Sequence, residues 1–358
     1  MSTYDVIIVG AAPAGSVAAL VLARAGHRVA LIDRAAFPRV KVCGNCINPA
    51  AWQIWNRLGL RAAFESLPHQ ELTGFTLHSE GRQIFEQTFR PPHRGPRAVA
   101  RDLLDDWLRR EAQGAGAKFL PETTVTGLDS QTGMVQTSRG DFSARLVLGA
   151  DGRNSQVARQ TGLMPPPRRC HRIAWQASVP APTDLDDHVH MHLFEEGYFG
   201  ICRYNSAEAV ISMVLDSRRT QDPLALVRRV FPRLEEQSWL RMNPITRAPA
   251  RIGTNRVWLI GDAARVVEPF TGEGITFALS TGILAAETAC EGLARNNFVS
   301  AFNLYAREHR RLYRRRAWVN TLMRWALTTP AWPVRLLRRM KPSPVLVSFL
   351  SHRVHATG

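Results

Sequence analysis

The 358-residue sequence predicts an α/β protein in which a parallel-sheet domain is interrupted by a second domain with a mixed or antiparallel sheet, followed by a helical C-terminal tail. Three observations support this fold class. A buried strand, a glycine-rich turn, a helix and another strand follow one another over residues 4–33. Continuous apolar strands of the same kind return at residues 144–149 and 257–260. Between them, residues 168–216 alternate apolar and polar side chains over short stretches, which favours strands with two different faces.

The composition excludes several classes of protein. With 45% hydrophobic and 21% charged residues, the chain is not generally disordered. It contains no run of about 18 uninterrupted apolar residues, so we expect no membrane-spanning helix. The first ten residues lack a basic segment and a cleavage pattern, and the five cysteines are few and scattered. We therefore expect a cytoplasmic location, with contact to the inner face of the membrane as an open alternative.

The turn after the first strand predicts a dinucleotide site. Gly10–Gly15 matches G-x-G-x-x-G except that Ala12 stands at the middle position. Such a turn lets the backbone approach a pyrophosphate, which the N-terminus of the following helix binds. Asp33 ends the second strand, where an acid would bind ribose hydroxyls. The simpler alternative is an ordinary βαβ unit. Only one such fingerprint occurs, which disfavours an enzyme with two dinucleotide-binding domains of this kind.

Three further motifs follow strands or precede helices. Arg101 stands at a strand-to-helix junction in A-V-A-R-D-L-L-D. Asp151 and Gly152 end the strand at residues 144–149. Gly261-Asp262 ends the strand at 257–260 and leads into P-F-T-G-E-G-I at residues 269–275. Each motif alone is also consistent with a turn at the end of a strand, but their common order is much more specific.

In this order the motifs resemble the FAD-dependent oxidoreductases of the para-hydroxybenzoate hydroxylase and geranylgeranyl reductase superfamily, from Tyr4 to about Glu291. The resemblance implies a Rossmann-like FAD-binding domain in three pieces, residues 1–72, 97–167 and 251–300. It implies a substrate domain at residues 73–96 and 168–250, and leaves a basic helical region at 301–358.

The resemblance also implies which residues hold FAD. Gly10, Gly15, Asp33 and Arg101 would bind the ADP half, Asp262 the ribityl chain, and the helix after Gly274 would face the flavin pyrimidine edge. Asp151 and Gly152 would serve the pyrophosphate and the passage of NAD(P)H. The full set of expected cofactor-binding residues is Gly10, Ala12, Pro13, Ala14, Gly15, Asp33, Arg34, Lys41, Cys43, Gly44, Arg101, Asp151, Gly261, Asp262, Gly272, Gly274 and Ile275.

Two stretches bear on the branch of the superfamily. F-P-R-V-K-V-C-G at residues 37–44 resembles the reductase branch, and it favours a flavin-contacting loop over a redox dithiol of Cys43 and Cys46. The reductases also carry G-Y-x-W-x-F-P, whereas here Gly200, Cys202 and Arg203 replace Trp, Phe and Pro. Reduction of a prenyl chain is therefore less favoured. The W-x-W-x-I motif of flavin-dependent halogenases is absent.

The substrate side is predicted less sharply. His188, His190 and His192 alternate along one strand, so their side chains share one face of it. That face is either solvated or turned towards the substrate, with one imidazole as a general base or donor; we expect no metal site. Trp175 is a further candidate for lining the substrate cavity. The candidate catalytic residues are His190, Tyr198, Arg203 and Pro269. Of these, the resemblance implies that Pro269 would line the reactive face of the flavin ring.

The function predicted from these motifs is an FAD-dependent, NAD(P)H-dependent monooxygenase that uses O2 on a hydrophobic or aromatic small molecule. Two alternatives remain open. One is a geranylgeranyl-reductase-like enzyme that reduces C=C bonds of a prenyl or polyketide chain. The other is a flavin-binding redox sensor without turnover. In each case FAD is the cofactor, and NAD(P)H is the transient reductant of the two enzymes.

The formal charge of +16 has its largest block in the C-terminal region. Residues 303–358 contain twelve basic residues and one acid, Glu308. Arg307, Arg310, Arg311 and Arg314–Arg316 precede a stretch rich in Trp and Leu. We expect either a helical cap with solvated arginines or a peripheral contact with a membrane surface, and no nucleic-acid partner.

Overall fold

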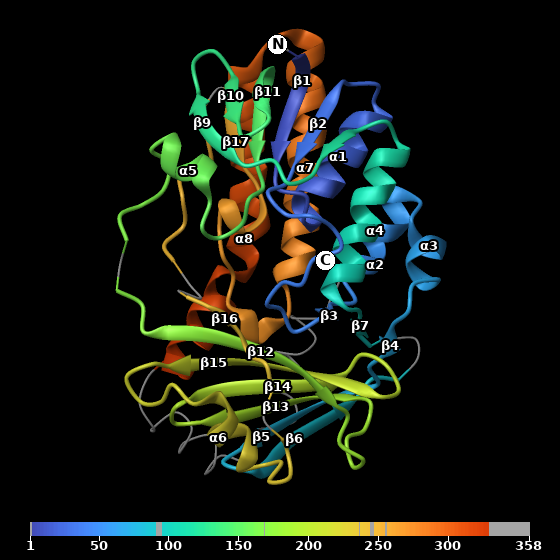
Figure 1. Cartoon of the computed structure of the whole chain (residues 1–358), viewed down its shortest axis with the longest axis vertical. Helices are drawn as coiled ribbons and strands as arrows, with labels where there is room; N and C mark the ends of the chain where they lie inside the picture. The colour runs from blue at the N-terminus through green and yellow to red at the C-terminus, as the bar shows by residue number, and fades with distance from the viewer. Residues whose placement is uncertain are drawn as a thin grey trace.

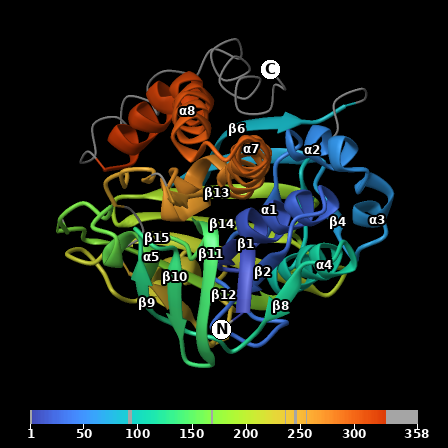
Figure 2. The same cartoon turned by 90° about the horizontal axis from the view of Figure 1, so that it is seen from above.

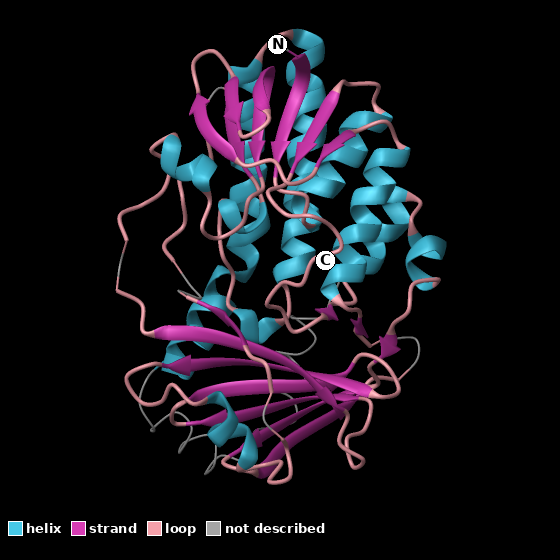
Figure 3. Ribbon diagram, viewed as in Figure 1, coloured by secondary structure: helices cyan, strands magenta, loops and turns pink. Residues whose placement is uncertain are grey.

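The computed structural model describes residues 2–90, 95–167, 169–235, 237–243, 247–254 and 256–328. Two large sheets dominate it, one above the other in Figure 1, and helices pack on the upper sheet (Figure 3). The upper sheet draws its strands from the beginning, middle and later part of the chain. The predicted class, a discontinuous Rossmann-like domain with an inserted sheet domain, is confirmed. The bounds of the six predicted segments stay predictions.

The upper sheet has the order β8-β2-β1-β11-β10-β9, with β17 paired to β11. β1 runs parallel to β2 and β11, and β11 runs parallel to β17, whereas β9 and β10 are antiparallel. The strands are β1 (Ser2–Val9), β2 (Val29–Ile32), β8 (Lys118–Leu120), β9 (Val125–Asp129), β10 (Met134–Thr137), β11 (Gly140–Gly149) and β17 (Val257–Leu259).

Both faces of this sheet are buried, which explains the continuous apolar runs in the sequence. Val6 and Ile8 of β1 pack with the helices on one side. Ile7 and Val9 pack on the other side, with Val135 of β10 among their neighbours. Successive side chains of β1 therefore pack into two cores, one on each face of the sheet, instead of alternating between a core and solvent.

The helices are α1 (Pro13–Arg24), α2 (Ala51–Leu58), α3 (Arg61–Glu65), α4 (Arg101–Gly114), α5 (Gln156–Gln160), α6 (Pro223–Arg228), α7 (Gly274–Arg295) and α8 (Phe298–Thr328). Two 3-10 turns, η1 (Gly261–Ala263) and η2 (Pro269–Thr271), precede α7. α1 packs against both α4 and α7, and α7 packs against α8. The view from above shows this helical layer on one side of the upper sheet (Figure 2).

The lower sheet has the order β16-β12-β15-β14-β13-β5-β6, in which only the β5–β13 pairing is parallel among those described. Its strands are β5 (Gly74–Ser79), β6 (Arg82–Thr88), β12 (Arg172–Pro180), β13 (His188–Phe194), β14 (Gly197–Arg203), β15 (Glu208–Asp216) and β16 (Leu240–Met242). The mixed sheet predicted for this region is thus confirmed.

The two faces of the lower sheet have different neighbours. On one face, Met191, Tyr198 and Val214 form a cluster with Val42 and Phe270, which come from loops of the upper domain. We call this the inner face. On the other, Phe199 and Ile211 pack with α6, and we call this the outer face.

A small third sheet, which the sequence did not predict, joins β3 (Cys46–Ile47), β7 (Arg97–Ala98) and β4 (Gln70–Glu71). β3 and β4 both pair with β7, directly before Arg101 at the start of α4. The loop that contains Cys43 and Gly44 is thereby anchored next to that arginine.

The last described element is α8. Tyr305 of this helix is fully buried, stacks on Trp258 and donates a hydrogen bond to the carbonyl of Leu259 (2.6 Å). The first part of α8 is therefore core. Within the described residues, no helix is long and apolar enough to cross a membrane. The predicted basic and aromatic surface beyond Arg314 lies outside the described side chains, and residues 329–358 lie outside the described structure.

Candidate active site

The turn between β1 and α1 requires glycine at two positions. Gly10 has φ +107°, and a Cβ there would overlap the carbonyl of Ala150. A Cβ on Gly15 would overlap the carbonyl oxygen of Gly10. Ala12 occupies the N-cap position of α1, with Pro13 next to it and no capping hydrogen bond from its side chain. The first N–H groups of α1 are thus available to an anion.

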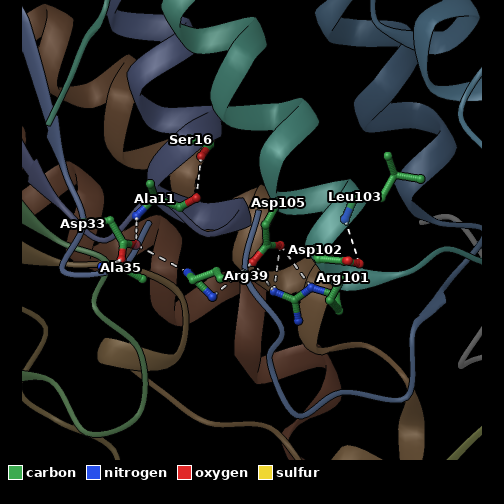
Figure 4. A network of polar contacts seen from close by, with 9 residues as sticks. All are labelled: Ala11, Ser16, Asp33, Ala35, Arg39, Arg101, Asp102, Leu103 and Asp105. Carbon is green, nitrogen blue, oxygen red and sulfur yellow. Dashed lines mark hydrogen bonds and ion pairs between the residues drawn. The ribbon is translucent and has the colours of Figure 1, made fainter. Parts of the chain in front are cut away.

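Asp33 closes this turn, as Figure 4 shows. Its Oδ2 accepts a hydrogen bond from the N–H of Ala11 (2.8 Å), and its Oδ1 accepts one from the N–H of Ala35 (3.0 Å). Arg39 lies 3.4 Å from Oδ2. Asp33 is 7% exposed, whereas the side chain of Arg34, also an expected ligand, is exposed. The carboxylate predicted to bind ribose therefore sits against the phosphate-binding turn.

A charge network extends from Asp33 to Arg101 (Figure 4). Arg39 lies 3.6 Å from Asp105, and Arg101 holds both oxygens of Asp105 at 2.9–3.0 Å. Arg101 and Asp105 are buried. Burial lowers the pKa of Arg101, but Asp105 opposes it and the net shift is upwards, so Arg101 stays charged. The sequence interpretation named Arg101 but neither Arg39 nor Asp105 as site residues, although Asp105 stands at i+4 from Arg101.

Asp151 lies beside Gly10, since a Cβ on Gly10 would be 2.9 Å from the Cα of Asp151. Its Oδ2 accepts hydrogen bonds from the N–H groups of Gln156 (2.6 Å) and Val157 (3.1 Å) at the start of α5. Its Oδ1 is buried without a hydrogen-bond partner in the described part of the chain. Burial raises the pKa of this carboxyl above its usual value. A buried acceptor next to the phosphate-binding turn fits a site for a polar group.

Asp262 lies among cations. Its carboxylate interacts electrostatically with Lys41, Arg153 and Arg247. Arg247 also donates to the main-chain carbonyl of Asp262 (2.6 Å), which fixes η1. Burial and the nearby Arg101 lower the pKa of Lys41, while Asp262 opposes this shift. Arg153 and Arg247 were not found from the sequence because only the fold brings them to η1.

The N-terminus of α7 is also without a side-chain cap. Gly272 has φ +64°, and Glu273 in the N-cap position makes no capping hydrogen bond to α7. By contrast, Ser155 caps α5 and Asp222 caps α6 through side-chain oxygens. Ile275, in the first turn of α7, is buried. Free N–H groups at this end give the positive pole that a negatively charged ligand edge needs.

α1, α7 and η1 meet closely. A Cβ on Gly282 of α7 would overlap the carbonyl of Ala14, and a Cβ on Gly261 would lie 3.0 Å from the Cβ of Ala14. The N–H of Gly261 donates to the hydroxyl of Thr281 (3.0 Å). The residues present fit a bound dinucleotide. Two helix ends are uncapped, Asp151 offers a buried acceptor, and glycines stand where a side chain would collide with neighbouring backbone.

The loop of residues 39–45 joins this site to the inner face of the lower sheet. The N–H of Cys43 donates to Gln176 of β12 (2.6 Å), and Ser212 of β15 donates to the carbonyl of Cys43 (3.0 Å). Cys43 and Cys46 are free thiols, and burial raises the pKa of Cys46 well above its usual value. A raised thiol pKa disfavours a reactive dithiol. The contacts favour the predicted role as a flavin-contacting loop.

The inner face carries one charged cluster in an apolar surrounding. Tyr198 donates to Glu268 (2.9 Å), and Arg172 holds both oxygens of the same carboxylate at 2.8 and 2.9 Å. Glu268 directly precedes Pro269, and the ring of Phe270 packs edge-on against Tyr198, with centroids 5.3 Å apart. The structure thus brings two of the predicted catalytic residues, Tyr198 and Pro269, to the same place.

The other two predicted catalytic residues lie elsewhere. His190 shares the outer face with His188 and His192, because Val189 and Met191, which alternate with them, belong to the inner face. Arg203 is also on the outer face and donates to the carbonyls of Leu185, Pro182 and Ser206. His190 and Arg203 therefore lie on the face that points away from the loops of the upper domain, and their catalytic roles stay predictions. Alternation predicted that the imidazoles share a face, but not which face meets the upper domain.

Trp175, the further lining candidate, also lies on the outer face, where Arg241 stacks over its ring at 5.1 Å. Across the described residues, no group of three or more His, Cys, Asp or Glu side chains is arranged to hold a metal ion.

A glycine-rich turn at an uncapped helix, an acid at the end of the second strand and a second uncapped helix beside the lower sheet define a flavoenzyme of the Rossmann type. The sequence matches the FAD binding domain family over residues 3–294, and the chain belongs to that family. It is an FAD-dependent oxidoreductase, as its motifs predicted.

Known proteins similar to this chain act on different substrates. The menaquinone reductase of Mycobacterium tuberculosis is 32% identical over 316 residues, which cover 79% of this chain and 76% of the relative. The geranylgeranyl diphosphate reductase of Rhodobacter capsulatus is 31% identical over 313 residues, 80% of this chain and 75% of the relative. A crystal structure of the Pseudomonas aeruginosa protein PqsL, described as "a probable FAD-dependent monooxygenase", shares the fold with a TM-score of 0.74 at 17% identity, covering 98% and 100% of the two chains.

Proposed function

We propose that this protein is an FAD-dependent reductase that saturates C=C bonds in the isoprenoid chain of a lipophilic molecule. The observation that carries the proposal is the apolar inner face of the lower sheet. Ala174, Met191, Leu193 and Val214 surround Tyr198 there, together with the partly buried Phe75, Leu77 and Val189. A hydrocarbon chain is matched by such a surface, because its burial needs no polar partner.

The same surface speaks against the hydroxylation of a phenol. Such a reaction gains from a base that takes the phenolic proton, and histidine is the commonest such base. The histidines of β13 lie on the outer face. On the inner face, the hydroxyl of Tyr198 already donates its hydrogen bond to Glu268. The monooxygenase favoured by the sequence is therefore the second candidate, supported by the fold shared with PqsL.

One departure from the reductase pattern is compensated within the structure. Gly200 stands where the related reductases carry Trp, and a Cβ on Gly200 would lie 2.7 Å from the Sδ of Met191. Met191 therefore occupies the space above Gly200. A flexible thioether replaces an aromatic ring without making the surface polar, so the loss of Trp does not argue against an apolar substrate.

When bound, FAD would supply hydride transfer from a nicotinamide cofactor to one carbon of the C=C bond, and a proton from solvent would complete the addition at the other carbon. The residues of this chain bind and orient. The N-termini of α1 and α7 and the carboxylates of Asp33 and Asp262 would hold the dinucleotide, and the 39–45 loop and η2 would enclose the ring against the inner face. The apolar side chains there would exclude water from the alkene.

The test is anaerobic reduction of the purified, FAD-loaded protein with NADPH or NADH, followed by menaquinone with an unsaturated chain. We expect each turnover to add two hydrogen atoms that remain after air reoxidises the quinone ring, as mass spectrometry would detect. Hydrogen lost again in air would indicate reduction of the ring instead. Incorporation of oxygen from 18O2 would replace the reductase by the monooxygenase.

The control for this experiment is Asp262→Asn, which keeps the size of the side chain but removes its charge among Lys41, Arg153 and Arg247. We expect the variant to lose most of its FAD during gel filtration and to lose turnover in proportion. Full FAD content in this variant would contradict the proposed contact of Asp262 with the ribityl chain.

A peripheral contact with an anionic membrane is a separate proposal. α8 exposes Arg307 and Arg311, each paired with Glu308, and also Arg310 and Arg314. Such a basic helix surface attracts anionic lipids. Deleting the helix would remove the buried Tyr305, so point variants are the better test.

We expect Arg310→Gln/Arg314→Gln to sediment less with phosphatidylglycerol vesicles than the unaltered chain does. Arg28→Gln/Arg139→Gln removes two exposed arginines from turns elsewhere in the molecule and serves as the control. Equal sedimentation of both double variants would contradict a contact through α8.

A further inference from the structure

The ion pair between Arg172 and Glu268 differs from the surface pairs of this protein. Both oxygens of Glu268 are held by Arg172, and Tyr198 adds a third hydrogen bond to the same carboxylate. Glu268 and Tyr198 are each 4% exposed. A buried charge pair is retained at a high desolvation cost, so this position requires the charges for a reason other than stability alone.

The three residues join the two domains. Arg172 and Tyr198 belong to β12 and β14 of the lower sheet, whereas Glu268 is the N-cap residue of η2 in the upper domain. Phe270 of η2 packs on Tyr198 at the same point. η2 is therefore fixed to the inner face by one ion pair, one neutral donor and one aromatic contact.

Tyr198 stays protonated and Arg172 stays charged near neutral pH. Burial and the neighbouring Glu268 raise the pKa of Tyr198 well above its usual value, so the phenol remains a donor. Burial lowers the pKa of Arg172, but its hydrogen bonds to Glu268 reverse this and the net shift is upwards. One positive and one negative charge thus face each other next to Pro269.

We infer that Tyr198, Glu268 and Arg172 form a positioning device that fixes η2, and with it Pro269, at the flavin ring, and that their balanced charges tune the reduction potential of bound FAD. This inference rests on the proposed function, because it requires that FAD binds here with η2, and so Pro269, against the flavin ring. It does not depend on the identity of the substrate. Reduced flavin carries negative charge, so an unbalanced charge beside it stabilises or destabilises that state according to its sign.

The decisive measurement is the midpoint potential of the FAD-loaded protein at pH 8. Glu268→Gln leaves Arg172 unbalanced, so we expect a shift to more positive potential. Arg172→Gln leaves Glu268 unbalanced, so we expect a shift to more negative potential. The double variant is expected to return close to the original value. Shifts of the same sign, or none in either single variant, would overturn the electrostatic part of the inference.

Tyr198→Phe keeps the inference testable even where the charge variants fail to fold. It removes only one hydroxyl and keeps the ring packed on Phe270. We expect a smaller negative shift than for Arg172→Gln, since Glu268 loses one donor. Glu196→Gln is the matched control: it breaks an Arg–Glu pair (Arg229, 2.7 Å) whose arginine is half exposed, at the turn between β13 and β14. An unshifted potential in Tyr198→Phe, or an equal shift in Glu196→Gln, would overturn the inference.

The positioning part has a readout that needs no cofactor. In the FAD-free protein, hydrogen exchange of the backbone amides at residues 265–272 should be faster in Glu268→Gln than in the unaltered chain. Equal exchange would overturn the positioning role. Failure of the unaltered protein to bind FAD would instead overturn the proposed function and the electrostatic part of the inference. The exchange measurement would still test the positioning part, because it is made without FAD.

Discussion

The two faces of the lower sheet are built from neighbouring residues of the same strands, yet they have opposite characters. The inner face is mostly apolar, apart from the Arg172–Glu268 pair and the polar Gln176 and Ser212, and it meets the loops of the FAD-binding domain. The outer face carries a column of imidazoles. The ring centroids of His78 and His192 lie 4.3 Å apart, and His192 in turn stacks on Phe199 at 4.5 Å.

This contrast separates reaction from stability. The inner face would touch substrate and cofactor, so its residues should alter turnover. The imidazoles of the outer face are stacked and largely buried, with Asp186 as the acid bonded to His190 (2.7 Å). His192 has a buried Nδ1 without a partner among the described residues. The outer face should therefore respond to pH through folding.

The largest expected effect is loss of stability in acid. Burial, and then the neighbouring His78 and His190, lower the pKa of His192 to about 3. Between that pH and the unfolded value of about 6.5, only the unfolded chain binds the proton. Stability is thus complete above about pH 6.5 and falls as the pH decreases, by about 2 kcal/mol at pH 5 from His192 alone. Urea unfolding at pH 7 and pH 5 would measure this difference.

His192→Phe tests the assignment of that loss. Phenylalanine keeps the stack between His78 and Phe199 and cannot be protonated, so we expect a smaller difference between the two pH values. At pH 7 the variant should be at least as stable, because the buried Nδ1 is removed. An undiminished acid effect would place its origin in other groups, such as Glu86, Asp186 or His78 around the column.

On the inner face, Gly200→Ala should lower kcat/KM for an isoprenoid substrate roughly tenfold, equivalent to about 1.4 kcal/mol. The new methyl group would lie 2.7 Å from the Sδ of Met191 and push the thioether into the space proposed for the isoprenoid chain of the substrate. Gly114→Ala in α4, where a Cβ meets nothing within 4 Å, is the matched control and should leave kcat/KM unchanged. An unchanged kcat/KM in Gly200→Ala would mean that the substrate does not lie over β14.

The upper domain could be predicted largely from the sequence because its signals are local. The strand, turn and helix of residues 2–24 and the acid at Asp33 lie within one βαβ unit. α4 begins at Arg101 as predicted, and even its partner Asp105 is one helical turn away. Local spacing fixes the geometry in each case.

The lower domain depends on contacts between distant residues. Glu268 meets Arg172 across 96 residues, and no pattern in the sequence pairs them. The alternation of β13 predicted that its histidines share a face, but packing of Val42 and Phe270 decides which face meets the upper domain. For this reason the sequence did not separate Tyr198, which lies on the inner face, from His190 and Arg203, which lie on the outer face.

The smallest expected effect belongs to His190→Ala, and it bears most directly on the assignment of the two faces. His190 contacts Asp186 (2.7 Å) and His78 (3.2 Å), both outside the inner face. We expect kcat and KM to stay within about twofold of the unaltered enzyme, with a stability loss of about 1 kcal/mol from the lost hydrogen bonds. Tyr198→Phe, assayed in parallel, should change turnover because it loosens η2. If His190→Ala lost activity at unchanged stability while Tyr198→Phe did not, the outer face would be the one that binds substrate.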